Sequence, residues 1–494
     1  MATGGCIVNL FEIRMNRIYD FVQLTRDKRC RKMKSRPSIH VLVLGDVTRS
    51  PRIKNHAKSF SEDGWRAKFS GYRGDKPVSD DGVGDDVVYS YIMEPPAYLD
   101  NYFPRMLALV IKMIFLSIWL FFHLVKNMHE DLLFVQSPPA APTLVVVYCF
   151  ALLKRCPVCI DWHNYGYTIL DATSKQMSVA SRVYRFMELT FASWFLNSNA
   201  LVKTRHFAVS KALHLDLHDK TGIEALVVYD KPTKDFRPTA VDDAHKLFVR
   251  LSLTYPQLGG LDGAAQSTIF TEVYDESSGA CRWRVDRPAL VVSGCSWTPD
   301  DDFTVMVDAL DIYNAAVASS PNIHFHKLVC VVTGRGPMKP HFQEVLRKKD
   351  WKHVVVLTPW LEWTDYPLLL GSADLGVSLH RSTSNLDLPM KVVDLIGAEV
   401  PVLALTYPAL SELLPHGQLG YHFSTAEGLA NQLIHLLMPK EDFEGVGDSP
   451  DLVRCRRNLR KLKQVSKDWH AQWMETVSPT CAELVRRDTK EKWD

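Results

Sequence analysis

Several features that mark common protein classes are missing from this chain of 494 residues. It contains no Asn-x-Ser/Thr sequon, which fits a protein that faces the cytosol. Its net charge of +2 gives no overall attraction to nucleic acid. Residues 1–38 hold no apolar run long enough for a signal peptide or a membrane span. These absences turn attention to the globular part of the chain.

A disulfide framework is also missing, because the ten cysteines are scattered and several sit inside apolar strands. This distribution indicates reduced thiols. Cys156 and Cys159 have the spacing of a redox or zinc motif, but they precede a strand and no second pair occurs. We interpret them as structural and predict no cofactor.

A clear metal-binding pattern is missing as well. Asp300 and Asp302 form an Asp-x-Asp pattern, but a helix start with Thr298 as the N-cap explains these acids better, since acids in a first turn complement the helix dipole. His214 and His218 are one helical turn apart and lack a third ligand. The sequence therefore predicts no metal site.

The composition, 46% hydrophobic and 23% charged, is that of a globular chain long enough for two domains. A run at 26–36 has seven basic residues and one acid, and either a solvated arm or attraction to an anionic membrane leaflet explains it. The predicted divisions are a basic N-terminal arm at 1–38, a Rossmann-like domain at 39–240, an insertion or linker at 241–287, a second Rossmann-like domain at 288–452, and a C-terminal helical segment at 453–494 that crosses back to the first domain.

The second half of the chain has the pattern of a parallel, doubly wound sheet. Short β-branched runs at 328–333, 354–357 and 401–405 are separated by segments with helical periodicity. The first run ends in Gly-Arg-Gly-Pro, and glycines at such a turn let the backbone approach a ligand. Pro389 suits a first helical position, which puts Lys391 in a first turn where a diphosphate can bind.

The first half has the same type of pattern, starting with a strand at 39–44 that ends near Asp46. A later strand at 158–161 is followed at once by polar residues, among them Asp161 and His163. Active sites of open α/β sheets lie at the carboxyl ends of the strands. An acid, an imidazole and an amide within four positions therefore indicate a site rather than isolated hydrogen-bonding groups.

The most apolar long segment, residues 106–125, has the length of a transmembrane helix and a single lysine near its centre. Strands at 39–44 and 66–70 precede it, and strands at 132–136 and 157–161 follow it. A single crossing would put these strands of one sheet on opposite sides of the bilayer. We therefore expect a helix that packs on the domain and lies in the membrane interface; a buried core helix is the alternative.

Several motifs together resemble the GT-B glycosyltransferases, and more narrowly the chitobiosyldiphosphodolichol β-mannosyltransferase family. They lie at 45–52, 161–167, 334–337, 358–361, 365–377 and 386–394. The resemblance runs from about residue 39 to 437 and fades between about 241 and 287. It implies two Rossmann-like, doubly wound α/β domains that face a cleft, with the donor nucleotide on the second and the acceptor on the first.

The activity implied by this resemblance is that of an inverting β-1,4-mannosyltransferase. Mannose would move from GDP-mannose to the distal GlcNAc of dolichyl-diphosphate chitobiose in N-glycan precursor assembly. The implied location is the endoplasmic reticulum membrane, with the catalytic domains on its cytoplasmic face. Implied partners are the membrane surface and other transferases of the same pathway.

The predicted donor site lies in the second domain. Lys391, Arg335 and the helix terminus near 389 can stabilise the leaving group without a metal. Asp394 matches the acid that similar enzymes use on the ribose, and Asp387 is expected to bind sugar hydroxyls. The predicted donor-binding residues are Arg335, Gly336, Trp360, Asp387, Lys391 and Asp394.

The predicted acceptor site lies in the first domain. His163 is the first candidate for the general base, because similar enzymes hold a histidine after this strand; Asp161 is the alternative base or an orienting group, and Asp46 is the rival. A diphosphate acceptor needs cations, so Arg49 and Arg52 are expected to bind it, although surface charge would also explain them. Asn164 and Tyr165 complete the expected acceptor-binding set.

Two rival functions stay open. One is a GT-B enzyme with another sugar nucleotide or lipid acceptor, because residue types fix neither guanine nor mannose selectivity. The other is a non-catalytic subunit that docks a partner transferase on the membrane. Polar groups at the strand ends argue against this scaffold.

Overall fold

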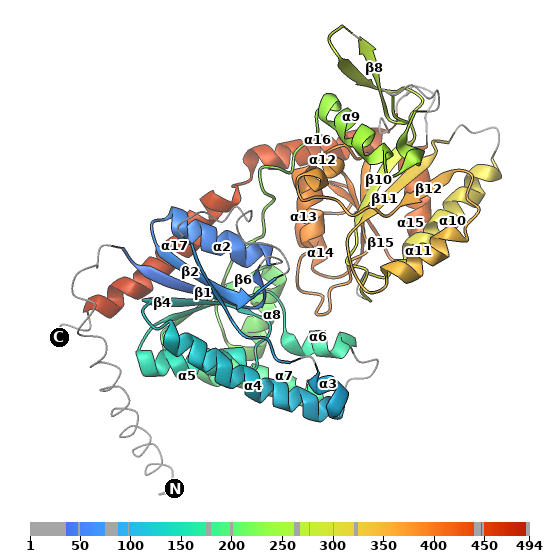
Figure 1. Ribbon diagram of the computed structural model, residues 1–494. Helices are drawn as coiled ribbons and strands as arrows, with labels where there is room; N and C mark the ends of the chain where they lie inside the picture. Colours follow the sequence, from blue (N-terminus) through green and yellow to red (C-terminus); the bar gives the residue numbers. More distant parts are fainter. Residues whose placement is uncertain are drawn as a thin grey trace, which may run out of the picture. The chain divides into compact units, whose positions relative to one another are not determined.

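The computed structural model describes residues 36–47, 50–74, 87–96, 98–173, 179–197, 201–260, 267–275, 277–299, 301–320, 325–438, 446 and 449–490. The chain forms two compact units, Met1–Tyr229 with His470–Asp494, and Asp230–Trp469 (Figure 1). Arg49 and most of the predicted basic arm lie outside the described residues.

The division of the chain differs from the predicted one at two points. The second unit begins at Asp230, so the segment predicted as a linker at 241–287 belongs to it. The predicted C-terminal segment is split: helix α16 (Pro450–Val465) belongs to the second unit and most of α17 (Trp469–Lys490) to the first. Arg456 of α16 donates to the carbonyl oxygen of Asp374, and Trp473 of α17 donates to the buried ring of His56.

The first unit is built on a parallel sheet in the order β3-β2-β1-β4-β5-β6-β7, which is a doubly wound order. Its strands are β1 (Ser38–Asp46), β2 (Arg66–Tyr72), β3 (Val88–Tyr91), β4 (Leu132–Ser137), β5 (Val158–Trp162), β6 (Thr204–Ala208) and β7 (Ala225–Val227). Its helices before α17 are α2 (Pro51–Glu62), α3 (Leu99–Tyr102), α4 (Arg105–Lys126), α5 (Thr143–Lys154), α6 (Gly166–Thr173), α7 (Val179–Phe191), the π-helical turn η3 (Ala192–Leu196) and α8 (Lys211–Thr221).

The second unit has a parallel sheet in the order β12-β11-β10-β13-β14-β15 and a separate antiparallel hairpin, β8-β9. The strands are β8 (Thr271–Asp275), β9 (Ala280–Trp283), β10 (Ala289–Gly294), β11 (Leu328–Thr333), β12 (Val354–Leu357), β13 (Leu375–Ser378), β14 (Val402–Leu405) and β15 (Gly420–Phe423). Besides α16, the helical segments are α9 (Val241–Ser252), the 3₁₀ turn η4 (Pro256–Leu258), α10 (Thr304–Ala318), α11 (Lys339–Arg347), α12 (Asp365–Gly371), α13 (Met390–Gly397), α14 (Leu410–Leu413) and α15 (Ala426–Leu437).

Local sequence explains where several helices begin and end. Ser210 accepts a hydrogen bond from the N–H of Leu213 and so caps α8, which ends at Gly222 in the left-handed region. Thr425 caps α15 and Ser449 caps α16 in the same way. These capping bonds satisfy backbone groups that a helix end would otherwise leave without partners.

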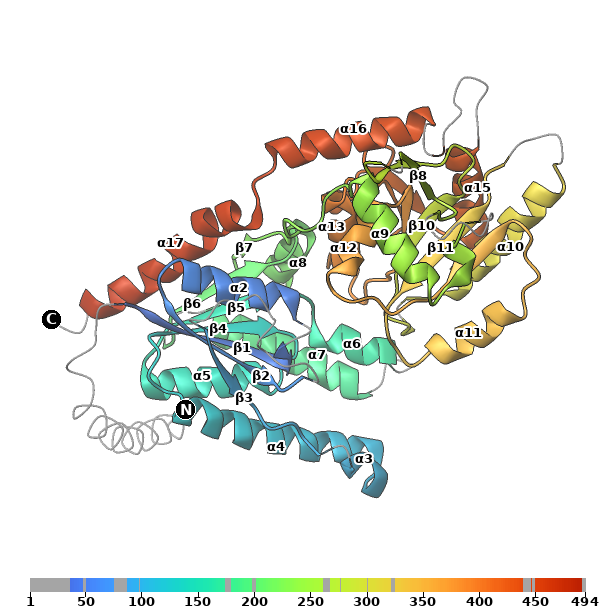
Figure 2. The same ribbon diagram turned by 45° about the horizontal axis from the view of Figure 1, so that its top comes forward.

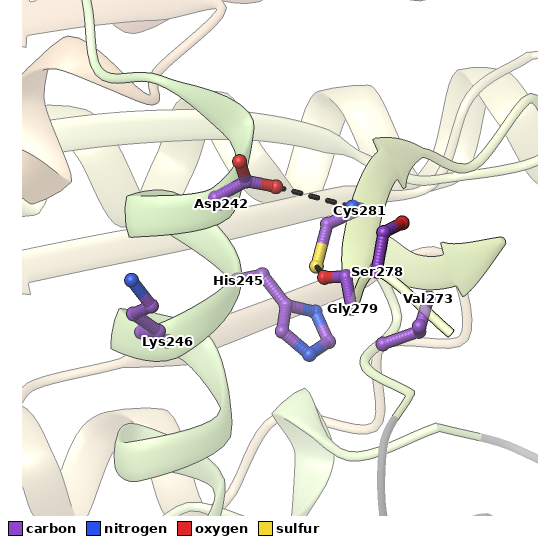
Figure 3. Close-up of a pocket in the computed structure, with 7 residues that line it drawn as sticks. All are labelled: Asp242, His245, Lys246, Val273, Ser278, Gly279 and Cys281. Carbon is purple, nitrogen blue, oxygen red and sulfur yellow. Dashed lines mark hydrogen bonds between the residues drawn. The ribbon is translucent and has the colours of Figure 1, made fainter. Parts of the chain in front are cut away.

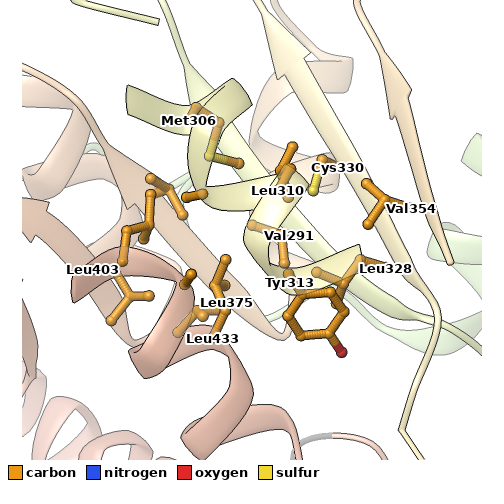
Figure 4. Close-up of a cluster of buried hydrophobic side chains, with 14 of the residues drawn as sticks. Val291, Met306, Leu310, Tyr313, Leu328, Cys330, Val354, Leu375, Leu403 and Leu433 are labelled. Carbon is orange, nitrogen blue, oxygen red and sulfur yellow. The ribbon is translucent and has the colours of Figure 1, made fainter. Parts of the chain in front are cut away.

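The core of the second unit lies between its sheet and helices α10 and α15, as the side chains in Figure 4 show. Leu375 and Val377 of β13 belong to this core. Gly376 between them faces the other side of the sheet, where a Cβ would overlap Leu395 of α13. The glycine therefore lets α13 lie close against the sheet, and α13 is the helix that carries Lys391.

In the two parallel sheets, the strands β3, β6 and β13 were not predicted from the sequence. Strand β13 has only four residues and contains a glycine, which weakens the strand pattern. Strand β6 carries Arg205 and His206, and the buried His206 accepts a hydrogen bond from the indole of Trp162. A polar residue buried through one specific partner gives no apolar signal, so the sequence pattern missed it.

Helix α4 lies along the first unit (Figure 2). It precedes β4 in the chain and follows β1, and these two strands pair directly. A single crossing of a bilayer would separate them, so the predicted topology argument holds for the structure. In the described part of the chain, this is the one helix whose length and composition would allow a span, and 22% of its apolar window is buried.

The segment predicted as an insertion forms α9 and the β8-β9 hairpin, which enclose a hollow of about 420 Å³ (Figure 3). Asp242 accepts a hydrogen bond from the N–H of Cys281, and His245 lies 2.9 Å from the hydroxyl of Thr271. None of the predicted donor-binding residues lines this hollow.

Candidate active site

The candidate donor site lies in the second unit, at the carboxyl ends of β10 and β11 and the start of α13. Two glycines bring the loops together: a Cβ at Gly334 would overlap the carbonyl oxygen of Cys295, and one at Gly336 would overlap that of Ser296. Gly334 also has a φ of 139°, a conformation that favours glycine. Loop packing by itself therefore explains why Gly336 is a glycine, and its role in donor binding stays a prediction.

Arg335 and Trp360, both predicted to bind the donor, contact each other. The guanidinium carbon of Arg335 lies 3.8 Å from the centre of the Trp360 ring, which is a cation–π contact. Trp360 is 45% exposed, so the pair is accessible from solvent. Lys339, which the sequence analysis did not select, adds a second cation, and its ammonium donates to the carbonyl oxygen of Gly334 at 3.0 Å.

Lys391, in the first turn of α13, forms an ion pair with Asp301. The same carboxylate of Asp301 accepts a hydrogen bond from the N–H of Ser296 at 2.6 Å. Asp301 is buried, and burial by itself raises the pKa of a carboxyl group, but the ammonium of Lys391 outweighs it and the pKa of Asp301 is below its usual value. An ionised acid thus connects the loop after β10 to the candidate phosphate-binding lysine.

The structure corrects two predicted helix starts. Thr298 does not cap a helix, because α10 begins at Thr304; Asp301 instead lies in the turn between them. Pro389 is the N-cap residue of α13 rather than its first helical residue. Asp300 lies outside the described residues. In the described part of the chain, no group of three His, Cys, Asp or Glu side chains could hold a metal ion.

Asp387 is largely buried and holds its own loop together. Its carboxylate accepts a hydrogen bond from Ser382 and lies 3.2 Å from Nε2 of His380. Its backbone carbonyl accepts a further bond from Tyr407. These contacts give Asp387 a structural role in the loop between β13 and α13, and its binding of sugar hydroxyls stays a prediction.

Asp394, predicted to contact the ribose, lies one turn beyond Lys391 in α13. Burial and the nearby carboxylate of Asp230 raise the pKa of Asp394 to about 7. Its charge also adds to burial in raising the pKa of Tyr366. A carboxyl group that is partly protonated near neutral pH can both donate to and accept from a sugar hydroxyl.

In the first unit, the predicted acceptor residues Arg52 and Asp161 form a buried ion pair with each other. The Nε and Nη2 atoms of Arg52 each donate to one oxygen of Asp161 at 2.8 Å, and Nη1 donates to the carbonyl oxygen of Val228. Arg52 is 2% exposed and Asp161 is fully buried. Burial raises the pKa of Asp161 and the positive charge of Arg52 lowers it. The lowering effect prevails, so the pKa of Asp161 is below its usual value.

This pair gives both residues a structural role. Both oxygens of Asp161 accept hydrogen bonds from Arg52 inside the unit, and both side chains are buried. Both side chains hold α2 against β5 and the loop after β7. The predicted roles of Asp161 as a base and of Arg52 as a diphosphate-binding residue stay predictions.

His163 directly follows β5, and its N–H donates to the carbonyl oxygen of Ser137 at 2.8 Å. Its side chain is partly exposed, but its Nε2 atom is buried and has no hydrogen-bond partner among the described residues. The role of His163 as the general base stays a prediction. Asp46 is half-buried at the end of β1, where its backbone carbonyl accepts a bond from Ser50.

The residues after His163 have structural roles that the sequence did not reveal. The side-chain oxygen of Asn164 accepts bonds from the N–H of Tyr165 and the hydroxyl of Thr168 at the start of α6. Tyr165 is fully buried, and its hydroxyl donates to Asp216. Direct acceptor binding by Asn164 and Tyr165 stays a prediction.

Glu188 of α7 is a buried acid that the sequence analysis did not select. Its carboxylate accepts hydrogen bonds from the N–H groups of Gly166 at 3.0 Å and Tyr167 at 3.2 Å, the first two residues of α6. Burial raises the pKa of Glu188 to about 7, against the opposing effect of these two bonds. Its contact with α6 could not be predicted, because Glu188 is distant from α6 in the sequence and a single acid inside a helix forms no recognisable motif.

Comparisons with known proteins place these two sites in context. The family model "Glycosyl transferases group 1" matches residues 291–438, which contain the cationic loops. The chitobiosyldiphosphodolichol beta-mannosyltransferase of Mus musculus is 35% identical over 90% of this chain and 88% of that protein. The enzyme of the same name from Homo sapiens is 34% identical over 92% and 94%. The UDP-glycosyltransferase TURAN of Arabidopsis thaliana is 33% identical over 90% and 97%.

Solved structures support the fold. A structure of Anabaena HepE in complex with UDP and glucose superimposes with a TM-score of 0.58 at 15% identity, covering 90% of this chain and 99% of that one. WaaG, a glycosyltransferase involved in lipopolysaccharide biosynthesis, gives a TM-score of 0.54 at 12% identity, covering 89% and 99%. Together with the sequence relatives, this shows that the chain has the GT-B fold and belongs to the chitobiosyldiphosphodolichol beta-mannosyltransferase family of glycosyltransferases.

Proposed function

We propose that this protein transfers mannose from GDP-mannose to the distal GlcNAc of dolichyl-diphosphate chitobiose, with inversion at the anomeric carbon. The observation that carries this proposal is the group of cations at the strand ends of the second unit, Arg335, Lys339 and Lys391, in a chain of this family. Such cations suit a nucleoside diphosphate leaving group.

The proposed reaction is a single displacement. The 4-hydroxyl oxygen of the acceptor sugar forms a bond to the anomeric carbon of mannose, while the bond from that carbon to the diphosphate oxygen breaks. The hydroxyl proton goes to His163, and the electron pair of the broken bond leaves with GDP. Lys391 stabilises that negative charge by exchanging its ion pair with Asp301 for one with the diphosphate.

The guanine and mannose of the donor are part of the proposal. One relative carries the name UDP-glycosyltransferase, so a UDP-sugar donor is the second candidate. Both donors share the diphosphate, and the cations therefore suit either one. Asp394 is proposed to bind a ribose hydroxyl in both cases, through a carboxyl group whose pKa is raised to about 7.

The membrane is the second part of the proposal, because a dolichyl acceptor keeps its diphosphate close to a bilayer. Helix α4 supports this location: Ile114, Trp119 and Phe122 are exposed, whereas Leu120 and Leu124 are buried against the unit. We place the enzyme on the cytoplasmic face of the endoplasmic reticulum membrane. Contact with other transferases of the same pathway stays a prediction.

A donor panel tests the proposal. Purified protein is incubated with a short-chain lipid-diphosphate chitobiose and, separately, with labelled GDP-mannose, UDP-glucose and UDP-GlcNAc. We expect a trisaccharide product from GDP-mannose, with a β linkage in its NMR spectrum. If a product forms only with a UDP-sugar, that sugar nucleotide is the donor instead of GDP-mannose. If no donor gives a product, the non-catalytic scaffold is favoured. The variant Lys391→Ala should form less of the trisaccharide product, because it lacks the lysine proposed to bind the diphosphate.

A further inference from the structure

The outer helix layer of the first unit joins three helices into one surface. Phe121 of α4 and Phe150 of α5 have their ring centres 6.5 Å apart. On the other side of α5, Tyr148 packs edge-on against Phe191 of α7 and Phe195 of η3. Helix α5 thus lies between α4 and the continuous segment of α7 and η3, and Figures 1 and 2 both draw these helices on the same side of the sheet.

The segment of α7 and η3 is turned with its apolar side outward. Phe186 is 70% exposed and Trp194 is 71% exposed, while Ser181 and Glu188 are buried. The exposed apolar side chains of this segment are Val179, Val183, Phe186, Met187, Trp194 and Phe195. Val179, Val183, Met187 and Trp194 follow one another at spacings of four, four and seven residues, which is the spacing of one helical stripe, and Phe186 lies beside Met187. A water-exposed helix would have the opposite arrangement, so this stripe needs an apolar environment.

The charges of the same three helices are nearly all positive. Residues 105–126, 143–154 and 179–196 contain six lysines and arginines and a single acid, Glu188. That acid is buried and accepts the two N–H bonds of α6, so it adds no negative charge to the outer surface. Exposed apolar residues on helices whose charges are nearly all basic match an anionic lipid surface, which offers both an apolar interior and negative headgroups.

We propose that α4, α5 and the α7–η3 segment form one continuous lipid-binding face, and that α7–η3 inserts into an anionic bilayer alongside α4. This deepens the proposed function, which assigns only α4 to the membrane. Glu188 connects α7 to the first turn of α6. Helix α7 would therefore link the bilayer to the candidate acceptor loop. The loop with His163 would thereby keep a constant distance from the lipid headgroups.

Vesicle binding tests the proposal without any sugar nucleotide, so its failure and a failure of the donor panel are distinguishable. The full chain is incubated with vesicles of phosphatidylcholine alone, or with added phosphatidylserine, and the bound fraction is measured by flotation. The double variant Phe186→Ser with Trp194→Ser should bind both vesicle types roughly 10- to 100-fold less than the parent. The control pair is Leu253→Ser with Val465→Ser, which changes residues 83% and 81% exposed in the other unit. It should bind like the parent.

The charge part has its own variant. Arg182→Gln should lower binding to the phosphatidylserine vesicles about fivefold and leave binding to neutral vesicles unchanged. Because Arg182 is exposed, this variant also covers the case in which the double variant fails to fold.

Two results would overturn the proposal. One is equal vesicle binding by the parent and the Phe186/Trp194 variant, with loss of binding only when Trp119 and Phe122 of α4 are changed to serine. The other is a parent protein that does not bind vesicles but forms dimers in light scattering, with the same α7 variant monomeric. In that case a second copy of the chain covers the face.

Discussion

The two units place the residues of their motifs differently. In the second unit, the glycine loops and the start of α13 leave cations accessible: Trp360 under Arg335 is 45% exposed, and Lys391 pairs with a single acid. In the first unit, most motif residues bind one another inside the unit, as Arg52 and Asp161 do. A motif at a strand end can therefore mark either a ligand site or the frame that supports one. Burial and pairing separate the two cases.

The largest expected effect comes from His163, which is only partly buried and whose Nε2 atom has no hydrogen-bond partner among the described residues. His163→Ala should lower the catalytic constant about 10²- to 10⁴-fold with donor affinity unchanged, because a general base contributes that much. Turnover with saturating acceptor and equilibrium binding of the donor measure the two quantities. If Asp46→Asn abolishes turnover and His163→Ala does not, the base lies at the end of β1 instead.

Arg52→Ala tests whether the Arg52–Asp161 pair is part of the frame. Removing one partner leaves a buried, uncompensated carboxylate, so the free energy of unfolding of the first unit should fall by about 3 to 5 kcal/mol. Denaturant melting followed by fluorescence measures it. The double variant Arg52→Met with Asp161→Leu, which removes both charges, should recover a large part of the loss. A stable Arg52→Ala protein that fails only in acceptor binding would restore Arg52 as a substrate contact.

Lys391→Ala makes the opposite comparison in the second unit. Lys391 is partly exposed, and the buried Asp301 keeps its hydrogen bond from Ser296, so this change should cost less stability than Arg52→Ala. It should weaken donor use by roughly 2 to 4 kcal/mol, through a lost charge-assisted bond. Steady-state kinetics against donor concentration give this value. Lys348→Ala, an exposed lysine of the same unit, is the control. Unchanged kinetics for Lys391→Ala and Arg335→Ala would show that the diphosphate does not bind beside these two residues.

Glu188 gives the comparison a pH dependence. Its pKa is raised from 4.5 to about 7 in the folded protein, so the folded state holds the proton more tightly than the unfolded state. Raising the pH from 4.5 to 7 therefore lowers the free energy of unfolding, by about 1.4 kcal/mol for each pH unit and about 3 kcal/mol in all. Above pH 7 the effect levels off.

Glu188→Gln removes this titration. Melting of the parent and the variant at pH 5 and pH 8 should show the parent losing about 2 to 3 kcal/mol relative to the variant. Glu94→Gln, a change of an exposed acid in the same unit, serves as the control. A stability difference that does not change with pH would mean that Glu188 is already ionised at pH 5.

The smallest effect is expected from a chelator. Arg335, Lys339 and Lys391 supply positive charge for the diphosphate, so the transferase rate should not change in EDTA. Loss of activity that magnesium or manganese restores would contradict this and return Asp302 to consideration as a ligand.

Local patterns in the sequence were sufficient for the fold. Alternating apolar runs and turn residues predict the two parallel sheets, because both signals depend on neighbours in the chain. The glycines at 334 and 336 and the position of Lys391 after Pro389 are likewise local, and the structure places them at the strand ends. The short strand β13 was not predicted, because its glycine weakens the strand pattern.

The tertiary structure alone decided which polar residues face inward. Arg52 and Asp161 are 109 positions apart in the chain, and nothing in either segment indicates that they satisfy each other. Glu188 and Asp301 gain their roles in the same way, from N–H groups and a lysine that the fold brings to them. A buried charge is stable only beside a partner, and the partner's position depends on the packing of helices against the sheet rather than on local sequence.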